Sequence, residues 1–193
     1  MERICVYCGS SPGRVPAYRE AADAFGRTLA DRGLGLVYGG GKGGLMGAVA
    51  DATLSAGGAA HGVIPEPLLD REPPHEGLTA LDVVDTMHER KQRMVELADG
   101  FVALPGGFGT LEELLEVLTW AQLGFHTDPC GFLNVDGYFD ELVAFFDRQV
   151  ADGFVSEAHR EMVVVTDDAD ALLEAFAAHE PPPVKGYDAD GDP

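Results

Sequence analysis

A carboxylate follows a glycine-rich turn near the middle of the chain. The stretch Pro105-Gly106-Gly107-Phe108-Gly109-Thr110-Leu111-Glu112-Glu113 lies between an apolar run that ends at Leu104 and a helical pattern that starts at Leu111. Glycines lack a Cβ and let backbone N–H groups approach a ligand, and the positive end of a following helix favours phosphate. Glu113 lies one helical turn further on. The stretch therefore predicts chemistry on a phosphorylated substrate.

The same residues have a second interpretation. Thr110-x-x-Glu113 also matches a capping box, in which the Thr hydroxyl and the Glu carboxylate satisfy the first free N–H groups of a helix. Spacing alone favours the cap, because glutamates are common in the first turn of helices. The rest of the chain has to decide between the two.

A cation is expected on the inner side of another helix. In residues 87–98 the apolar stripe consists of Met94, Leu97 and Ala98, and one turn back from Met94 lies Arg90. The helix dipole disfavours a positive charge at a helix start, so Arg90 requires a negative partner. That partner is either a structural carboxylate or a substrate group bound in fork geometry.

Two further glycine-rich turns follow apolar runs. Gly9-Ser10-Ser11-Pro12-Gly13 ends the run 3–8, and residues 39–47 follow the run 34–38. Gly39-x-Gly41-x-x-Gly44 fits the dinucleotide fingerprint, with Glu66 at a suitable distance to bind a ribose, but one match in a chain with 25 glycines is weak evidence. Lys42 is followed by glycine rather than Ser or Thr, so the phosphate loop of nucleoside triphosphatases is excluded and Lys42 is predicted to be a surface charge.

Short apolar runs alternate with helical patterns along the chain. Strands are expected at 3–8, 34–38, 61–64, 81–84, 100–104, 131–135 and 162–165. The first helix is expected from 16 to a stop at Gly33, and the second from the turn 39–47 to about 55. Further helices are expected over 87–98, 111–123, 138–151 and about 168–178. On the helix 138–151, Phe145 and Phe146 are expected to face inward. The alternation predicts one Rossmann-like doubly wound parallel α/β sheet of about seven strands, in a single catalytic domain of residues 1–179.

Ligands of such sheets bind at the carboxyl edge of the strands, where the three glycine-rich turns are expected to meet. A nucleotide-like ligand is therefore the leading inference. Residues 65–77 are rich in Pro, Glu and Asp and predict a mobile loop over the site. Residues 180–193 predict an acidic, Pro- and Gly-rich disordered tail.

Composition excludes several classes of protein. No run of 18 apolar residues and no leader pattern occurs, so we expect a cytoplasmic protein that does not bind membranes. The formal net charge of −20 would repel nucleic acid. The chain has three cysteines, and Cys5 and Cys8 lie within a predicted strand without further ligands, so we expect core residues rather than disulfides or a metal site.

The chain resembles the LOG (Lonely Guy) family of cytokinin-activating phosphoribohydrolases, which were often labelled lysine decarboxylases. The resemblance covers residues 3–178 and is carried by ICVYCGSS, VYGGGKGGLMG, MHERK, and PGGFGTLEE with the TWAQLG that follows. It implies hydrolysis of the N-glycosidic bond of N6-modified adenosine 5′-monophosphates, and of AMP in some members, to free base and ribose 5-phosphate. It also implies a homodimer with its site near the interface, and we expect no cofactor.

The resemblance assigns roles to particular residues. The catalytic pair is Arg90, from the MHxRK motif, and Glu113, the last Glu of PGGxGTxxE. Substrate contacts implied by the resemblance are Glu72, Lys91, Thr119 and the loop of Gly107, Phe108, Gly109, Thr110, Leu111 and Glu112. Further contacts to substrate or phosphate are expected from the glycine-rich turns and the quoted motifs: Gly9, Ser10, Gly40, Gly41, Gly44, Met46, Met87 and Gly106.

Physical chemistry constrains these roles. Departure of the base leaves oxocarbenium character on the ribose, which Glu113 can stabilise while it orients or deprotonates the attacking water. Arg90 cannot donate a proton at ordinary pH, so it is expected to hold the substrate and position Glu113. Two alternatives stay open. A lysine decarboxylase would need pyridoxal phosphate on Lys42 or Lys91, and a nucleotide-binding sensor would bind without turnover.

Overall fold

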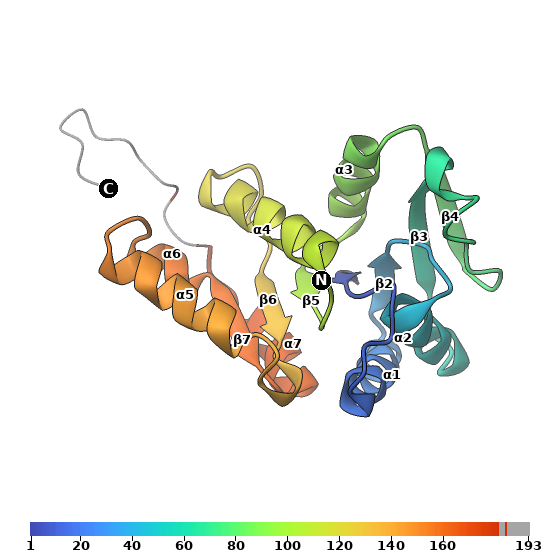
Figure 1. Cartoon of the computed structure of the whole chain (residues 1–193), viewed down its shortest axis with the longest axis horizontal. Helices are drawn as coiled ribbons and strands as arrows, with labels where there is room; N and C mark the ends of the chain where they lie inside the picture. The colour runs from blue at the N-terminus through green and yellow to red at the C-terminus, as the bar shows by residue number, and fades with distance from the viewer. Residues whose placement is uncertain (182–183, 185–193) are drawn as a thin grey trace.

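The computed structural model describes residues 1–181 and residue 184. They form a seven-stranded parallel sheet with helices on both faces (Figure 1). This confirms the predicted Rossmann-like fold. The predicted tail of residues 180–193 lies outside the described residues, apart from 180, 181 and 184.

All seven expected strands are present. They are β1 (Arg3–Tyr7), β2 (Gly35–Tyr38), β3 (Ala60–Pro65), β4 (Ala80–Val84), β5 (Phe101–Ala103), β6 (Cys130–Leu133) and β7 (Val163–Thr166). The helices are α1 (Pro16–Asp31), α2 (Gly44–Ser55), α3 (Met87–Leu97), α4 (Phe108–Gln122), α5 (Asp140–Ala151), α6 (Glu157–Glu161) and α7 (Ala169–Ala177), with 3-10 turns η1 (Glu66–Leu68) and η2 (Val135–Gly137). Helix α6 was not predicted, because five residues are too short to show helical periodicity.

The strand order is β4-β3-β2-β1-β5-β6-β7, and every neighbouring pair is parallel. From β1 the chain builds outward through β2, β3 and β4, and then returns to pair β5 with the other side of β1. The order therefore reverses between β1 and β5. The carboxyl ends of these two strands bound the crevice in which ligands of doubly wound sheets bind.

Two apolar clusters fill the space between the sheet and the helices. Alternate residues of a strand point to opposite faces, so Ile4 and Val6 pack with α1, α2 and α7, whereas Cys5 and Tyr7 pack with α3, α4 and α5. Figure 1 shows the blue and teal helices α1 and α2 together on one side of the sheet. The prediction that Cys5 and Cys8 are core residues is confirmed, since both are buried and free.

Two helices begin at residues other than those expected. Helix α4 begins at Phe108, three residues before the predicted start, because Phe108 is 95% exposed and takes no part in the apolar stripe that marked the helix. Helix α5 begins at Asp140, because η2 occupies the residues before it. The prediction that Phe145 faces inward is wrong, since it is 56% exposed, while its neighbour Phe146 is buried.

The predicted loop of residues 65–77 is tied to the second glycine-rich turn. Lys42 N donates to Pro73 O at 3.3 Å and His75 N donates to Gly40 O at 2.9 Å. His75 also reaches Asp51 on α2, with 2.9 Å between Nε2 and Oδ1. These bonds hold the loop across the carboxyl edge of the sheet and place Glu72 beside the site.

Candidate active site

Arg90 and Glu113 form an ion pair between α3 and α4. Arg90 Nη1 lies 3.3 Å from Glu113 Oε1, and the two side chains are 9% and 11% exposed. Arg90 Nε also donates to the carbonyl oxygen of Val63, at 3.2 Å. The negative partner that the sequence required for Arg90 is thus Glu113 itself.

The start of α3 is fixed by its own cap. Thr86 accepts a hydrogen bond from Glu89 N at 3.1 Å, and Glu89 Oε2 accepts one from Asp85 N at 3.0 Å. These bonds satisfy N–H groups that the helix cannot satisfy internally. They fix the first turn of α3, so Arg90 enters the site from a rigid element.

The capping-box interpretation of Thr110 and Glu113 is wrong. The N-cap of α4 is Gly107, and among the described residues no side chain caps this helix. Thr110 is therefore the third helical residue, and Glu113 lies in the second turn with its carboxylate directed at Arg90. The helix begins before the threonine, which places Glu113 beyond the orphan N–H groups that a cap would satisfy.

Gly39 makes room for the arginine. A Cβ at this position would collide with Arg90 Nη2 and would lie 3.1 Å from Met46 Sδ. Gly39 was not among the expected contacts, although it belongs to the VYGGGKGGLMG motif. The sequence signal for this contact is a glycine directly after a predicted strand, which leaves room for the arginine that the helical pattern places on the inner side of α3.

A cavity of about 320 Å³ opens around the ion pair. This volume lies within the range of small-molecule sites, about 300–1,000 Å³. The cavity brings together most of the predicted site residues: Gly9, Ser10, Met46, Glu72, Met87, Arg90, Gly107, Phe108, Gly109, Thr110, Glu112 and Glu113. Its lining also includes Val6, Tyr7, Cys8 and Gly39, which the sequence analysis did not assign to the site.

The helix start that follows the second glycine-rich turn already binds a carbonyl group of the first glycine-rich turn. Leu45 N and Met46 N, at the start of α2, donate to Gly9 O at 2.9 and 3.3 Å. A Cβ on Gly44 would collide with the backbone of Ser10. The positive end of α2 is therefore satisfied by a carbonyl from the loop after β1. The structure places Gly40, Gly41 and Gly44 outside the cavity lining, and Gly40 instead binds the 65–77 segment.

The start of α4 is open, in contrast to that of α2. A Cβ on Gly107 or Gly109 would meet no atom within 4 Å. Phe108, Gly109 and Thr110 supply the first N–H groups of this 15-residue helix, and all three residues line the cavity. This end of α4 can receive an anion, because its N–H groups and dipole favour negative charge.

Charge is unevenly distributed on the cavity wall. Glu72, Glu112 and Glu113 supply three carboxylates and Arg90 supplies a guanidinium. Burial raises the pKa of Glu113, Arg90 opposes this effect, and Glu112 adds to it, so that the pKa lies above its ordinary value. Glu113 is thus poised to take up a proton at a pH where an exposed glutamate is ionised.

Lys91 neutralises the neighbouring carboxylates. Its Nζ lies 2.5 Å from Glu112 Oε1 and 2.9 Å from Glu116 Oε1. Although burial disfavours the charged amine, these two carboxylates raise the pKa of Lys91. Lys91 is not part of the cavity lining, so the structure places it behind Glu112 rather than against a substrate.

Three other predicted contacts lie away from this cavity. Gly106 lines an adjoining cavity of about 250 Å³, and Leu111 packs in the apolar cluster beneath α4. Thr119 lies further along α4, where its hydroxyl donates to Leu115 O at 2.7 Å and its side chain lines a groove against α5.

The described residues contain no group of three or more His, Cys, Asp or Glu side chains that could hold a metal ion. Lys42 lies on the surface, with its Nζ 3.8 Å from Glu76 Oε1. Neither Lys42 nor Lys91 lines the cavity. The two lysines considered for a Schiff base are therefore not placed to form one there.

The fold and the site define a class of protein: a doubly wound α/β protein with a small-molecule cavity at the point where its strand order reverses. Solved structures of the same fold include the molybdenum cofactor carrier protein from Chlamydomonas reinhardtii, with a TM-score of 0.71 and 22% identity over 92% of this chain and 99% of that chain. Another is the molybdenum cofactor binding protein from Rippkaea orientalis, with a TM-score of 0.70 and 21% identity over 92% of this chain and 96% of that one. At these identities the likeness shows the fold alone.

Sequence comparison places the chain within that class. A family model described as "Possible lysine decarboxylase" matches residues 46–176. Cytokinin riboside 5′-monophosphate phosphoribohydrolase LOG from Oryza sativa subsp. japonica is 49% identical over 93% of this chain and 74% of its own length. LOG7 from Arabidopsis thaliana, with the same enzyme name, is 49% identical over 93% of this chain and 83% of its own length. The chain belongs to the LOG family of phosphoribohydrolases, as the sequence motifs predicted.

Proposed function

We propose that this protein hydrolyses the N-glycosidic bond of cytokinin riboside 5′-monophosphates and releases the free base and ribose 5-phosphate. The names of relatives about half identical to the chain support this activity. The observation that carries the proposal is the buried Arg90–Glu113 pair, which lies in a cavity bounded by the open start of α4.

The 5′-phosphate binds at the start of α4. Phe108, Gly109 and Thr110 offer N–H groups there, and the helix dipole favours a dianion. Glu72 supplies a carboxylate on another part of the wall, which disfavours a phosphate there. Charge therefore orients the substrate, with its phosphate at the helix start and its sugar toward Glu113.

Glu113 supplies the carboxylate of the reaction. It follows Gly109 by four residues, which is about 6 Å along the helix axis, so the ribose of a phosphate-bound substrate reaches it. Its negative charge stabilises the oxocarbenium character that develops as the base departs. It also accepts a proton from the attacking water, and its raised pKa makes it a stronger base than an exposed glutamate.

Arg90 holds this carboxylate in place. Its ion pair with Glu113 and its hydrogen bond to the carbonyl of Val63 fix the guanidinium from two sides, and Gly39 leaves space for it. Because guanidinium stays charged at ordinary pH, Arg90 acts by electrostatics and positioning rather than by proton transfer.

Product analysis tests the activity. The protein is incubated with N6-isopentenyl-AMP, AMP and N6-isopentenyladenosine, and released base is measured by chromatography. We expect base from the monophosphates only, and a rate lower by about 10²-fold or more in Glu113→Gln.

A matched control lies on the same helix. Glu116→Gln removes a carboxylate that binds Lys91 and does not line the cavity, so it should retain most of the activity. Release of base by Glu113→Gln at the wild-type rate would remove Glu113 from the chemistry. Mononucleotide binding without release of base from any substrate would instead favour the sensor alternative.

We also propose that the protein forms a homodimer, as the family resemblance implies. A mostly apolar groove of about 340 Å³ runs between α4 and α5, with exposed Phe145 at its edge and Thr119 in its lining. A partner that packs there would bring Thr119 to an interface. Light scattering on the eluted protein should give twice the chain mass, and a single chain mass that persists at high concentration would contradict the proposal.

The expected cytoplasmic location stays a prediction. In the described part of the chain, helices long and apolar enough to cross a membrane are absent.

A further inference from the structure

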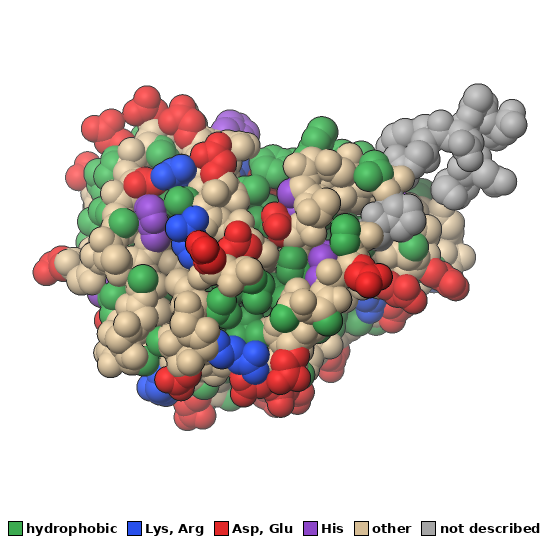
Figure 2. All heavy atoms as spheres, turned by 180° about the vertical axis from the view of Figure 1, so that it is seen from behind, with side chains coloured by type: hydrophobic (Ala, Val, Ile, Leu, Met, Phe, Trp, Pro, Cys, Tyr) green, Lys and Arg blue, Asp and Glu red, His purple; other side chains and the backbone are tan. Residues whose placement is uncertain are grey.

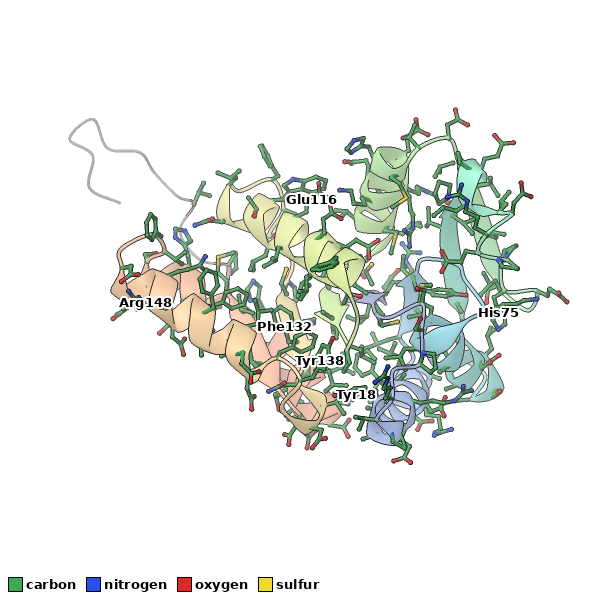
Figure 3. The ribbon with its side chains drawn as sticks, viewed as in Figure 1. Tyr18, His75, Glu116, Phe132, Tyr138 and Arg148 are labelled. Carbon is green, nitrogen blue, oxygen red and sulfur yellow. The ribbon has the colours of Figure 1, made fainter. Side chains whose placement is uncertain are left out.

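A tyrosine from the second half of the chain binds the backbone of the glycine-rich turn before α4. Tyr138 Oη donates a hydrogen bond to the carbonyl oxygen of Gly106, with 2.6 Å between the oxygens. Tyr138 lies between η2 and α5, in a stretch to which the motifs of the site do not extend. In Figure 3 it is labelled next to Tyr18 of α1, with which its ring is in contact.

This hydrogen bond fixes the orientation of one peptide group. The carbonyl of Gly106 and the N–H of Gly107 belong to the same planar trans peptide, so they point in opposite directions. Tyr138 and Gly106 line the adjoining cavity, whereas Gly107 lines both that cavity and the one around Arg90 and Glu113. A carbonyl held toward Tyr138 therefore turns the N–H of Gly107 away from Tyr138, and Gly107 is the N-cap residue of α4.

The same N–H is available to a ligand. Among the described residues no acceptor takes the N–H of Gly107, although that of Gly9 in the facing loop donates to Pro105 O at 3.1 Å. The Gly106 peptide is also confined on its other side. A Cβ on Gly106 would collide with Thr110 Oγ1 and would lie 2.9 Å from Gly9 N.

Tyr138 is itself held in a fixed position. Asn134 brackets the turn that carries it, because Asn134 Oδ1 accepts from Phe139 N and Asn134 Nδ2 donates to Asp140 Oδ1, both at 2.7 Å. The ring of Tyr138 packs edge-on against that of Tyr18, with centroids 5.3 Å apart. The hydroxyl thus reaches Gly106 from a preorganised turn rather than from a freely rotating side chain.

We propose that Tyr138 is a positioning residue for phosphate recognition: its hydroxyl orients the Gly106–Gly107 peptide so that the N–H of Gly107 joins the first N–H groups of α4 in binding the 5′-phosphate. The inference rests on the proposed function, which places phosphate at this helix start. A carbonyl that accepts a hydrogen bond also polarises the N–H of its own peptide, which strengthens that donor.

Tyr138→Phe tests the role, because it removes one oxygen and keeps the ring against Tyr18. We expect the KM for N6-isopentenyl-AMP to rise about three- to tenfold, which corresponds to roughly one hydrogen bond, with kcat changed by less than about twofold. The inhibition constants of ribose 5-phosphate and inorganic phosphate should rise by a similar factor. That of N6-isopentenyladenosine, which lacks the phosphate, should stay the same.

Tyr18→Phe is the matched control. It removes a hydroxyl from the neighbouring ring of the same cavity, and within the described residues that hydroxyl makes no hydrogen bond to protein. All constants should equal those of the wild type. Melting temperatures of both variants show whether the turn region remains folded.

Two outcomes overturn the proposal. One is an unchanged KM and unchanged phosphate inhibition in Tyr138→Phe. The other is an equal weakening of the riboside and the phosphate, which would indicate a general loosening of the site. If the wild type releases no base, the proposed function fails, and calorimetric titration of ribose 5-phosphate still measures the effect of Tyr138. Equal affinity of wild type and variant, or no binding to either, would then overturn the inference.

Discussion

Glu113 carries a carboxylate in a largely buried position, opposite one guanidinium. Burial raises its pKa, and the attraction of Arg90 offsets part of that effect. At the residue scale, these two opposing effects on the pKa of Glu113 suit the ion pair to the proposed reaction. A carboxylate held away from water interacts strongly with positive charge that develops on a nearby sugar, and its raised pKa gives it a higher proton affinity than an exposed glutamate.

The pH dependence of kcat should report this carboxylate. Because the pKa of Glu113 is raised, its ionised form is lost as the pH falls through a value above that of an ordinary glutamate, about 4.3. We expect kcat at saturating substrate to fall on the acid side with a midpoint above that value. A profile measured with N6-isopentenyl-AMP checks this, and a midpoint at or below about 4.3 would exclude Glu113 as the group that must be ionised.

Removal of Arg90 should cost stability as well as activity. Arg90→Met leaves the Glu113 carboxylate buried without its partner, and such a change lowers the free energy of unfolding by about 3–5 kcal/mol at pH 7. The pKa of Glu113 would rise further, so the folded state binds the extra proton and part of the lost stability returns as the pH falls through that pKa. Denaturant unfolding at several pH values measures both effects.

The double variant Arg90→Met with Glu113→Gln is the control for this prediction. It removes both charges, so its loss of stability should be smaller than that of Arg90→Met alone. Equal losses in the two variants would show that Arg90 stabilises the protein by packing rather than by pairing with Glu113.

At the scale of elements, the packing of α1 on α2 sets the position of the first loop. Gly26 lies at this contact. A Cβ there would collide with Val49 O and would lie 2.9 Å from Ala52 Cβ and 3.0 Å from Thr53 N. The close approach places the start of α2 where Gly9 O can accept from Leu45 N and Met46 N.

Gly26→Ala should therefore destabilise the protein, although alanine is the better helix former. We expect the clash with backbone to cost about 2–3 kcal/mol, which exceeds the gain of about 1 kcal/mol in helix propensity, so the free energy of unfolding should fall by about 1–2 kcal/mol. Gly109→Ala is the matched control, since a Cβ on this helical glycine meets no atom within 4 Å. Thermal unfolding should show a lower midpoint for Gly26→Ala and an equal or higher one for Gly109→Ala, and the reverse order would contradict the packing argument.

The sequence predicted the strands and helices more accurately than the residues at which the helices begin. The strands were recognisable because parallel strands buried on both faces are continuous apolar runs, as in Ile4 to Tyr7. The start of α4 was misplaced because Phe108 points to solvent and carries no periodic signal. The cap inferred at Thr110 failed for the same reason, since capping depends on where a helix begins rather than on spacing alone.

At the scale of the molecule, the net charge opposes an anionic substrate. The formal charge is −20, and Figure 2 shows many more acidic than basic side chains on the face that it presents. Such a field lowers the local concentration of anions around the protein. In the proposed mode of binding, the start of α4 must attract the phosphate over a short range against this background.

Salt should therefore assist the reaction. Screening shortens the range of the repulsion from about 30 Å at 0.01 M to about 8 Å at 0.15 M ionic strength, so kcat/KM for N6-isopentenyl-AMP should rise about two- to tenfold over that interval. Inhibition by the uncharged N6-isopentenyladenosine, measured at the same salt concentrations, is the control and should change little. A fall in kcat/KM with salt would show that local cations, rather than the net charge, govern capture of the substrate.

The sequence by itself determined the parts of this protein that depend on local pattern. Apolar periodicity defined the strands and helices, and the MHERK and PGGFGTLEE motifs predicted Arg90 and Glu113 as the catalytic pair, two residues that form an ion pair in the structure. The same information favoured the turn 105–113 as the phosphate site but also predicted contacts to substrate or phosphate from the other two glycine-rich turns, because each one follows a strand and precedes a helix.

Tertiary structure decided which of those turns stays open to a ligand. Gly9 O fills the start of α2, the 65–77 segment bonds to Gly40, and the start of α4 is left open beside Arg90. It also brought Tyr138, which follows β6, to Gly106, which follows the neighbouring strand β5. These outcomes depend on hydrogen bonds and packing between segments distant in the chain, which the strand order creates and no local pattern encodes.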